Sequence, residues 1–174
     1  MNSRIILTGA RGCGKTTVGK LLAHRMNRPL FDTDELVESA AQKSIRSIFE
    51  QDGEAAFRKL ESEALTKAMS APASVIATGG GCVIDSGNRD NMQNSGFVVW
   101  LTARPETMQS RIARDESAEG RRPNLTQLAT LDEIKHVFQQ REPLYRSIAN
   151  LTIDTDQLSP EAVVSAILAA CSNS

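Results

Sequence analysis

The chain carries no excess of charge and shows none of the patterns that mark a multi-part protein. Its 174 residues have a formal net charge of −1 and an isoelectric point near 6.1, so we expect neither nucleic acid nor an anionic membrane as a partner. The sequence has no internal repeat, low-complexity tract or linker-like stretch, which predicts a single domain over residues 1–174. An anionic ligand must therefore bind at a local site.

Cysteine is scarce, and no long apolar run begins the sequence. Cys13, Cys82 and Cys171 are odd in number and lack the spacing of metal ligands. No N-terminal segment resembles a signal peptide or a membrane span. The sequence thus predicts a protein of the reducing cytoplasm, and we expect it to act as a monomer.

A phosphate-binding motif lies near the start of the chain. Residues 9–16 fit the Walker A pattern G-x-x-x-x-G-K-[ST], with an apolar run before them and a helical pattern after them. Glycines at such a strand-to-helix turn let backbone N–H groups approach a polyphosphate, and the helix N-terminus favours negative charge. Lys15 would reach the β- and γ-phosphates of ATP, and the Thr16 hydroxyl would ligate Mg²⁺. The alternative is a glycine-rich turn that only connects a strand to a helix.

Two aspartates follow the next predicted strand, which begins at Leu30. Asp32 and Asp34 are two residues apart, and on an extended segment they point to the same side. If this strand neighbours the first one in a parallel sheet, its carboxyl end lies beside the Walker loop. Asp32 would then hold Mg²⁺ through its waters, and Asp34 would accept a proton from a substrate hydroxyl. Alternatively, Asp34 caps a helix that starts at Glu35, and Asp32 is a solvated turn residue.

Residues 35–70 are predicted to be helical, with breaks near residues 43–44 and 52–53. Arg58 and Glu61 are three apart on the last of these helices and can pair. Two interpretations stay open. The pair is either a surface ion pair of little consequence, or, beside Phe49 and Phe57, it braces a guanidinium that faces a carboxylate ligand.

A strand at residues 74–77 ends in Thr-Gly-Gly-Gly at residues 78–81. Three glycines at a strand end are unfavourable unless the backbone itself is needed. The N–H groups of Gly79, Gly80 and Gly81 would meet a phosphate or a sugar-like ligand across from the Walker loop, and a merely flexible loop is the alternative. The unbroken apolar run at residues 97–101 predicts a strand buried on both faces, with Trp100 in the core.

The rest of the chain alternates helices with one more strand. Helices are predicted at residues 105–114, 131–140 and 160–170, and a strand at 151–153. The polar segment 115–128 between the first two helices is predicted to be a lid, from which Arg122 would stabilise charge on the transferring phosphoryl group. A solvated basic surface loop is the alternative there. Together the elements predict an α/β three-layer sandwich with a five-stranded parallel sheet.

The ordered set of motifs resembles the shikimate kinases, and the resemblance spans nearly the whole chain. It rests on the Walker loop at 9–16, Asp32-Thr33-Asp34, Phe57-Arg58 with Glu61, the glycines at 79–81, Arg122-Pro123 and the Arg-Glu-Pro-Leu-Tyr run at 141–145. Nucleoside monophosphate kinases share the loop and the lid without the Asp-x-Asp and triple-glycine combination. The resemblance implies the adenylate-kinase-like P-loop fold and ATP-dependent phosphorylation of the 3-hydroxyl of shikimate, a step of aromatic amino acid biosynthesis.

The resemblance also implies a role for each matching residue. Asp34 contacts the reacting hydroxyl, and Lys15 and Arg122 complete the catalytic set. Shikimate is held by the helical region 33–61 and by the glycines, with Arg58 and Arg141 gripping its carboxylate. The full predicted set is Gly12, Cys13, Gly14, Lys15, Thr16, Thr17, Arg114 and Arg122 for ATP, Asp34, Phe49, Phe57, Arg58, Gly79, Gly80, Gly81 and Arg141 for shikimate, and Thr16 and Asp32 for Mg²⁺.

The sequence departs from the family at two places, both near the predicted adenine site. Residues 154–157 read Asp-Thr-Asp-Gln where many members have a basic residue, and the lid reads Arg-Pro-Asn-Leu instead of Arg-Pro followed directly by Leu. Two other functions stay open. One is a different small-molecule kinase of the same fold, such as a gluconate kinase, which need not keep both Arg58 and Arg141. The other is a nucleotide-binding module that switches conformation without catalysis and needs no base such as Asp34.

Overall fold

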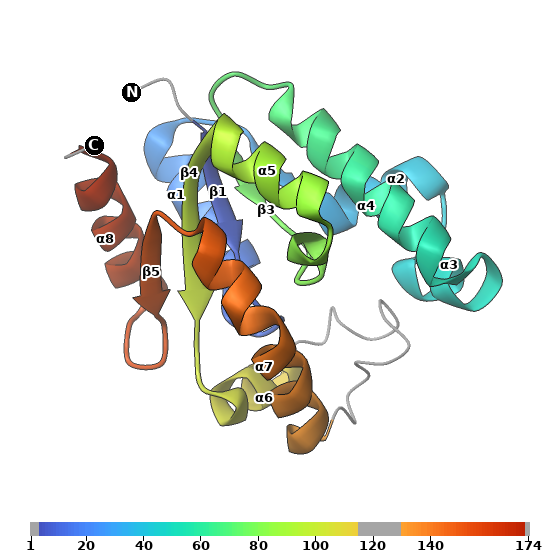
Figure 1. Cartoon of the computed structure of the whole chain (residues 1–174). Coiled ribbons are helices and arrows are strands. Elements are labelled where there is room, and N and C mark those ends of the chain that lie inside the picture. The colour runs from blue at the N-terminus through green and yellow to red at the C-terminus, as the bar shows by residue number, and fades with distance from the viewer. Residues whose placement is uncertain (1–3, 115–129, 173–174) are drawn as a thin grey trace.

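The computed structural model describes residues 4–114 and 130–172, which form a parallel sheet between two layers of helices (Figure 1). Every paired strand runs parallel to its neighbour, so the predicted α/β sandwich with five parallel strands is confirmed. The strands are β1 (Arg4–Thr8), β2 (Leu30–Asp32), β3 (Val75–Ala77), β4 (Gly96–Thr102) and β5 (Leu151–Asp154), and their order in the sheet is β2-β3-β1-β4-β5.

The sequence analysis left open whether the strand before Asp32 neighbours the first strand, and the strand order answers this. β2 does not neighbour β1, because β3 lies between them and pairs with both. All three residues of β3 are buried, whereas those of β2 are only half-buried, and the more apolar strand takes the central place. As a result the segments that follow β1 and β3 are direct neighbours, and Asp32 lies one strand further out.

The side chains of β1 alternate between two cores, one on each face of the sheet. Ile5 and Leu7 pack with α1 (Lys15–Met26) and α8 (Pro160–Ser172). Ile6 packs on the other face with Trp100 and with residues of α4 (Gly53–Met69), α5 (Ser86–Ser95) and α7 (Leu131–Ile148). Trp100 is a core residue, as predicted, with 2 % of its surface exposed. In the described ranges, no helix is both long enough and apolar enough to cross a membrane.

Three helices form a smaller cluster beside the β2 edge of the sheet, as Figure 1 shows on its right. They are α2 (Thr33–Ala41), α3 (Ile45–Gln51) and α4, and their breaks fall where the sequence predicts them. Ser44 begins α3 by accepting a hydrogen bond from the Ser47 N–H, which satisfies a backbone donor at the helix start. Val37, Ile48 and Phe57 fill the interior of the cluster.

The connections that follow β3 and β4 add two more elements. η1 (Cys82–Ile84) is a single turn that the sequence analysis does not anticipate, and α6 (Pro105–Arg114) has the predicted bounds. Ile112 of α6 and Ile134 of α7 share a small apolar cluster. The predicted lid, residues 115–128, and Arg122 within it lie outside the described residues.

The predicted end of a helix at residue 140 is wrong, because α7 continues to Ile148 with Pro143 inside it. A proline in a helix interior lacks a hydrogen-bonding N–H and typically destabilises the helix by about 3 kcal/mol. The continuation buries Tyr145 and Ile148 in the core with Trp100, and full burial of such side chains contributes roughly 1.5–3 kcal/mol each. Tertiary packing therefore overrides the local signal of the proline.

Candidate active site

The Walker loop, residues 9–16, has the backbone conformation that its glycines permit. Gly9, Gly12 and Gly14 have φ angles of 141°, 82° and 95°, in the region that side chains disfavour. A Cβ on Gly9 would also collide with the carbonyl oxygen of Leu101, and one on Gly12 would collide with the backbone of Met108. The loop is thus a close-fitting backbone turn between β1 and α1, which argues against a loose connector.

Lys15 begins α1 and folds back over the loop. Its Nζ donates to the carbonyl oxygens of Gly9 and Ala10 at 2.8 and 2.9 Å, so the ammonium lies over the backbone turn that the motif provides for phosphates. Thr16 and Thr17 are exposed in the first turn of the helix, whereas Cys13 is fully buried. Cys13 packs in the core with Ile5 and Leu7, so its side chain is not a ligand contact in this structure.

Asp32 and Asp34 lie together, but not for the reason that their spacing suggests. β2 ends at Asp32, and Asp34 belongs to the first turn of α2, so the interpretation that both sit on one extended segment is wrong. The alternative that Asp34 caps the helix is also wrong, because the cap is Asp32, whose Oδ1 accepts the Asp34 N–H at 3.0 Å. The Oδ2 atom of Asp32 accepts the hydroxyl of Thr16 at 3.0 Å. These contacts bring the Walker loop and the two aspartates together.

The pKa of the Asp32 carboxyl is raised above its ordinary value. Burial is the largest cause, and the negative charge of Asp34 is the second. A cation placed between the Asp32 carboxylate and the Thr16 hydroxyl would oppose both effects. Oxygen atoms of this kind are the ligands that Mg²⁺ prefers, so the pair fits the predicted metal role.

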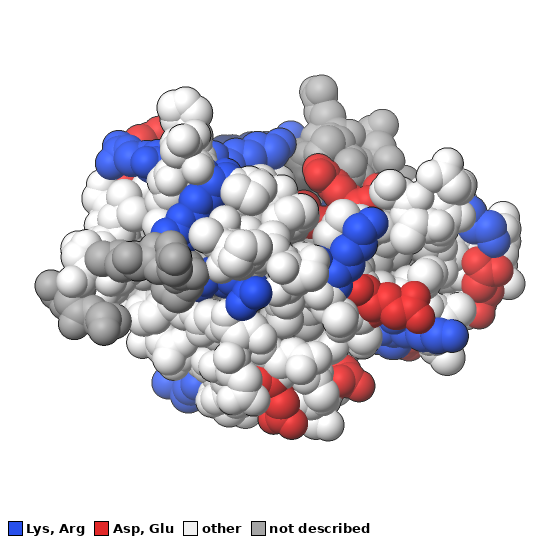
Figure 2. Space-filling model, turned by 90° about the horizontal axis from the view of Figure 1, so that it is seen from above, with Lys and Arg blue, Asp and Glu red and all other residues white. Residues whose placement is uncertain are grey.

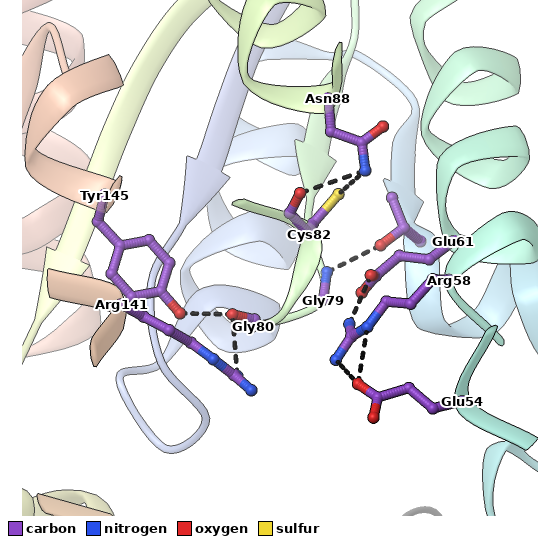
Figure 3. Close-up of polar contacts among 10 residues, drawn as sticks. Glu54, Arg58, Glu61, Gly79, Gly80, Cys82, Asn88, Arg141 and Tyr145 are labelled. Carbon is purple, nitrogen blue, oxygen red and sulfur yellow. Dashed lines mark hydrogen bonds and ion pairs between the residues drawn. The ribbon is translucent and has the colours of Figure 1, made fainter. Parts of the chain in front are cut away.

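The glycines at residues 79–81 form a turn after β3 that is held from three helices; we call it the three-glycine turn (Figure 3). The Gly79 N–H donates to the Thr33 hydroxyl of α2 at 2.8 Å. The Gly80 carbonyl accepts the Tyr145 hydroxyl of α7 at 2.5 Å. These bonds rule out a merely flexible loop, and they also use the Gly79 N–H that was predicted to face a ligand.

The third helix contributes Arg58, which lies so close to Gly81 that a Cβ there would collide with its guanidinium. Its Nη1 donates to Oε2 of Glu61 at 2.7 Å, and its Nη2 to Oε1 of Glu54 at 3.0 Å. Glu61 is 1 % exposed, so of the two interpretations of this pair the structure supports the brace. Burial alone would lower the pKa of Arg58, but the charges and hydrogen bonds of the two glutamates raise it above its ordinary value.

The two phenylalanines differ in exposure. Their ring centroids are 4.6 Å apart, and the Arg58 guanidinium lies over the Phe57 ring at 5.3 Å. Phe57 is fully buried and Phe49 only half-buried. In this structure Phe57 supports Arg58, and Phe49 is the ring with surface left for a ligand.

Arg141 approaches the three-glycine turn from the side opposite to Arg58 (Figure 3). Its Nη1 donates to the Gly80 carbonyl at 3.3 Å. Arg141 and Gly80 also line a hollow with Ala10 and Arg11 of the Walker loop. Arg114, by contrast, is exposed at the end of α6. The structure thus gathers the predicted loop, the aspartates, the turn, Arg58 and Arg141 at the carboxyl ends of β1, β2 and β3.

The sequence analysis missed a set of hydrogen bonds that hold the Walker loop from α6 and from the segment after β5. Arg111 of α6 donates to the hydroxyl and the carbonyl of Thr155, both at 2.8 Å, and to the Gly12 carbonyl at 3.3 Å. The Thr155 hydroxyl also contacts the Cys13 carbonyl at 3.2 Å. Thr155 belongs to the segment that departs from the family, but a lone arginine on an amphipathic helix gives no sequence signal.

The strands of Figure 1 point downward, so Figure 2, which is seen from above, shows the face opposite the site. Both basic and acidic side chains occur on that face. Among the described residues, no group of three or more His, Cys, Asp and Glu side chains has the arrangement of a metal centre.

Comparisons with known proteins match almost the whole chain. A family model described as shikimate kinase matches residues 11–172. The shikimate kinase of Rhodopirellula baltica is 42 % identical over 170 residues, covering 98 % of this chain and 91 % of that protein. The shikimate kinase of Symbiobacterium thermophilum is 42 % identical over 164 residues, covering 94 % and 93 %.

Solved structures give the same result. The structure of Acinetobacter baumannii shikimate kinase in complex with shikimate has a TM-score of 0.90 and 35 % identity, covering 98 % of this chain and 94 % of that one. The Aquifex aeolicus enzyme has a TM-score of 0.82 and 36 % identity, covering 98 % and 96 %. The similarity therefore extends well beyond the nucleotide loop.

Proposed function

This chain belongs to the shikimate kinase family, and we propose that it transfers the γ-phosphoryl group of ATP to the 3-hydroxyl group of shikimate in aromatic amino acid biosynthesis. The observation that carries the proposal is that two arginines contact one turn. Arg58 lies against Gly81 and Arg141 donates to Gly80, while Gly80 itself lies close to the carbonyl of Gly9 in the Walker loop. Two planar guanidinium groups can grip one carboxylate beside the loop that holds the phosphates.

In the proposed reaction Asp34 orients the substrate hydroxyl and accepts its proton as the oxygen attacks the γ-phosphorus. The bond between that phosphorus and the bridging oxygen breaks, and ADP leaves. Lys15 neutralises the charge that develops on the β- and γ-phosphoryl oxygens. The ammonium of Lys15 already lies over the loop, and Asp34 stands beside Asp32. Both positions agree with these roles.

Thr16 and Asp32 are the residues that would hold Mg²⁺. Their direct hydrogen bond brings a hydroxyl and a carboxylate oxygen to one point. Burial first, and the negative charge of Asp34 second, raise the pKa of Asp32, and a cation there would offset both. The metal supplies positive charge to the phosphoryl oxygens. Residues 12–17 together with Arg114 and Arg122 are the remaining proposed ATP contacts. Shikimate would be held by region 33–61, with Phe49 beside it.

We further propose that the chain acts as a single-domain monomer of the cytoplasm. A coupled ADP-release assay with shikimate, gluconate and nucleoside monophosphates as acceptors tests the main assignment. We expect turnover with shikimate alone, and mass spectrometry should find one added phosphoryl group on it. Lys15→Ala, purified in parallel, controls for contaminating kinases. Turnover of gluconate or a nucleotide, with no turnover of shikimate, would refute shikimate as the substrate. ATP binding with no turnover of any acceptor would favour a nucleotide-dependent switch module.

A further inference from the structure

Two buried hydroxyl groups hold the three-glycine turn, and neither has a role in the reaction proposed above. The Thr33 hydroxyl accepts the Gly79 N–H at 2.8 Å, and the Tyr145 hydroxyl donates to the Gly80 carbonyl at 2.5 Å. Both side chains are fully buried. A buried hydroxyl usually forms a hydrogen bond only to stabilise the fold. Any further role of these two hydroxyls depends on which backbone groups they bind.

The two hydroxyls bind opposite ends of the same dipeptide, from opposite sides. Thr33 opens α2 between Asp32 and Asp34. Tyr145 lies one helical turn after Arg141 on α7, and Figure 3 labels both of these residues. One fixes an N–H and the other a carbonyl, so together they set the orientation of the peptide groups between them. Glycine backbones otherwise have wide conformational freedom, and two consecutive glycines would not hold one orientation unaided.

The N–H groups of the next two residues depend on this orientation. Within residues 4–114 and 130–172, the N–H groups of Gly80 and Gly81 make no hydrogen bond, whereas the Cys82 N–H donates to the Gly79 carbonyl. Both glycines are buried, and Gly81 lies against the Arg58 guanidinium while Gly80 lies against that of Arg141. Free, fixed N–H groups in such a place are suited to bind oxygen atoms of an anionic substrate.

We propose that Thr33 and Tyr145 are positioning residues that hold the peptide groups on either side of the Gly79–Gly80 peptide and thereby aim the Gly80 and Gly81 N–H groups at the bound acid. This inference rests on the proposed shikimate kinase function. Tyr145 needs its hydroxyl for this and not for packing, because its ring already stacks on Trp100 with centroids 6.0 Å apart. Thr33 adjoins Asp34, so a change there alone could act through the base. Tyr145 lies on another helix, so the same kinetic effect from changes at both residues would not come from a displaced Asp34.

The test compares Tyr145→Phe and Thr33→Val with Thr33→Ser, which keeps the hydroxyl. Steady-state kinetics are measured with shikimate varied at saturating ATP and with ATP varied at saturating shikimate, and melting temperatures are recorded in parallel. The control is Arg4→Met, because Arg4 bonds the carbonyls of Ala71 and Ser95 at the opposite edge of the sheet. It removes side chain to backbone hydrogen bonds far from the turn.

We expect Tyr145→Phe and Thr33→Val each to raise the shikimate KM about three- to tenfold, the equivalent of one lost hydrogen bond. The ATP KM should stay within about twofold, and Thr33→Ser should resemble the wild type. Arg4→Met should lower Tm and leave both KM values unchanged, since a loss of folded enzyme scales the rate but not the KM.

An unchanged shikimate KM in Tyr145→Phe and Thr33→Val, or an equal rise for both substrates, would overturn the inference. A Thr33→Val variant that does not fold leaves the decision to Tyr145→Phe, which removes one oxygen atom while Arg141 still donates to Gly80. A wild-type enzyme without activity on shikimate would refute the proposed function instead. The two failures are therefore distinguishable.

Discussion

Replacing Arg58 by lysine keeps the positive charge but removes the planar fork. In the structure the guanidinium donates to Glu61 through Nη1 and to Glu54 through Nη2 and Nε, at 2.7, 3.0 and 3.3 Å. These carboxylates fix its plane beside Gly81. A lysine ammonium is a point charge on a flexible stem, so it can stay near Glu61 but cannot also present a pair of parallel donors to a substrate carboxylate.

The size of the effect follows from the bonds that are lost. A hydrogen bond to a charged group contributes about 1.5–3 kcal/mol, and each 1.4 kcal/mol corresponds to about tenfold in affinity. Losing one arm of the fork should therefore raise the shikimate KM of Arg58→Lys roughly 10- to 150-fold. None of the hydrogen bonds of Arg58 described here reaches the Walker loop, so the ATP KM should change by less than about twofold.

The assay is steady-state kinetics in both substrates, with circular dichroism to verify folding, because Glu61 is buried and keeps a weaker partner in this variant. Arg46→Lys is the matched control. Arg46 pairs with Glu50 on α3 at the i, i+4 spacing that also separates Arg58 from Glu54. Both of its side chains are about half exposed, and such pairs contribute little. Its kinetics should equal those of the wild type. If Arg58→Lys raises the KM values for ATP and shikimate equally, or raises neither, the assignment of Arg58 to the substrate carboxylate is refuted.

Four further changes test the other parts of the site. Lys15→Ala should abolish turnover while circular dichroism still reports a folded chain, and a retained kcat would exclude the Walker role. Asp34→Asn should lower kcat by about 10²- to 10⁴-fold at any Mg²⁺ concentration; rescue by excess Mg²⁺ would assign it to the metal instead. The pKa of Asp32 is raised in the folded state, so its ionised carboxylate destabilises the folded chain. The free energy of unfolding therefore falls as the pH rises above the ordinary carboxyl pKa. Asp32→Asn, which can still cap α2, should therefore raise Tm at neutral pH without Mg²⁺ but give no gain in strong acid, and should need more Mg²⁺ for turnover. Gly81→Ala should raise the shikimate KM because its methyl group displaces the Arg58 guanidinium, and unchanged kinetics would show that Arg58 tolerates the shift.

The sequence was sufficient for most of the elements and for the motifs that bind through the backbone. The Walker glycines, the strand that ends in three glycines and the helix breaks near residues 43 and 52 all carry local signals of their conformation. The α/β sandwich follows from the alternation of these elements. Each of these features depends on neighbours in sequence, which is why they could be predicted.

Most of the errors concern contacts between residues far apart in the chain. Nothing local to Leu30 or Asp32 says that β3 will insert between β2 and β1. The helix through Pro143 exists because Tyr145 and Ile148 have a core to enter, and that core is assembled by other strands. The hydroxyl contacts of Thr33 and Tyr145 likewise depend on packing across 46 and 65 positions, beyond the reach of any motif.

The three-glycine turn also limits how this site can be redesigned for another acid. Glycine has no side chain to shorten, so a bulkier acceptor cannot be accommodated by trimming the turn. A side chain added at Gly81 would collide with Arg58, so the turn cannot grow to suit a smaller one either. The room for an acceptor beside the turn is set by α2 and α4 on one side and by α7 on the other. Any change of acceptor size must therefore begin with the core residues that space these helices apart, and directed evolution should concentrate its mutations there.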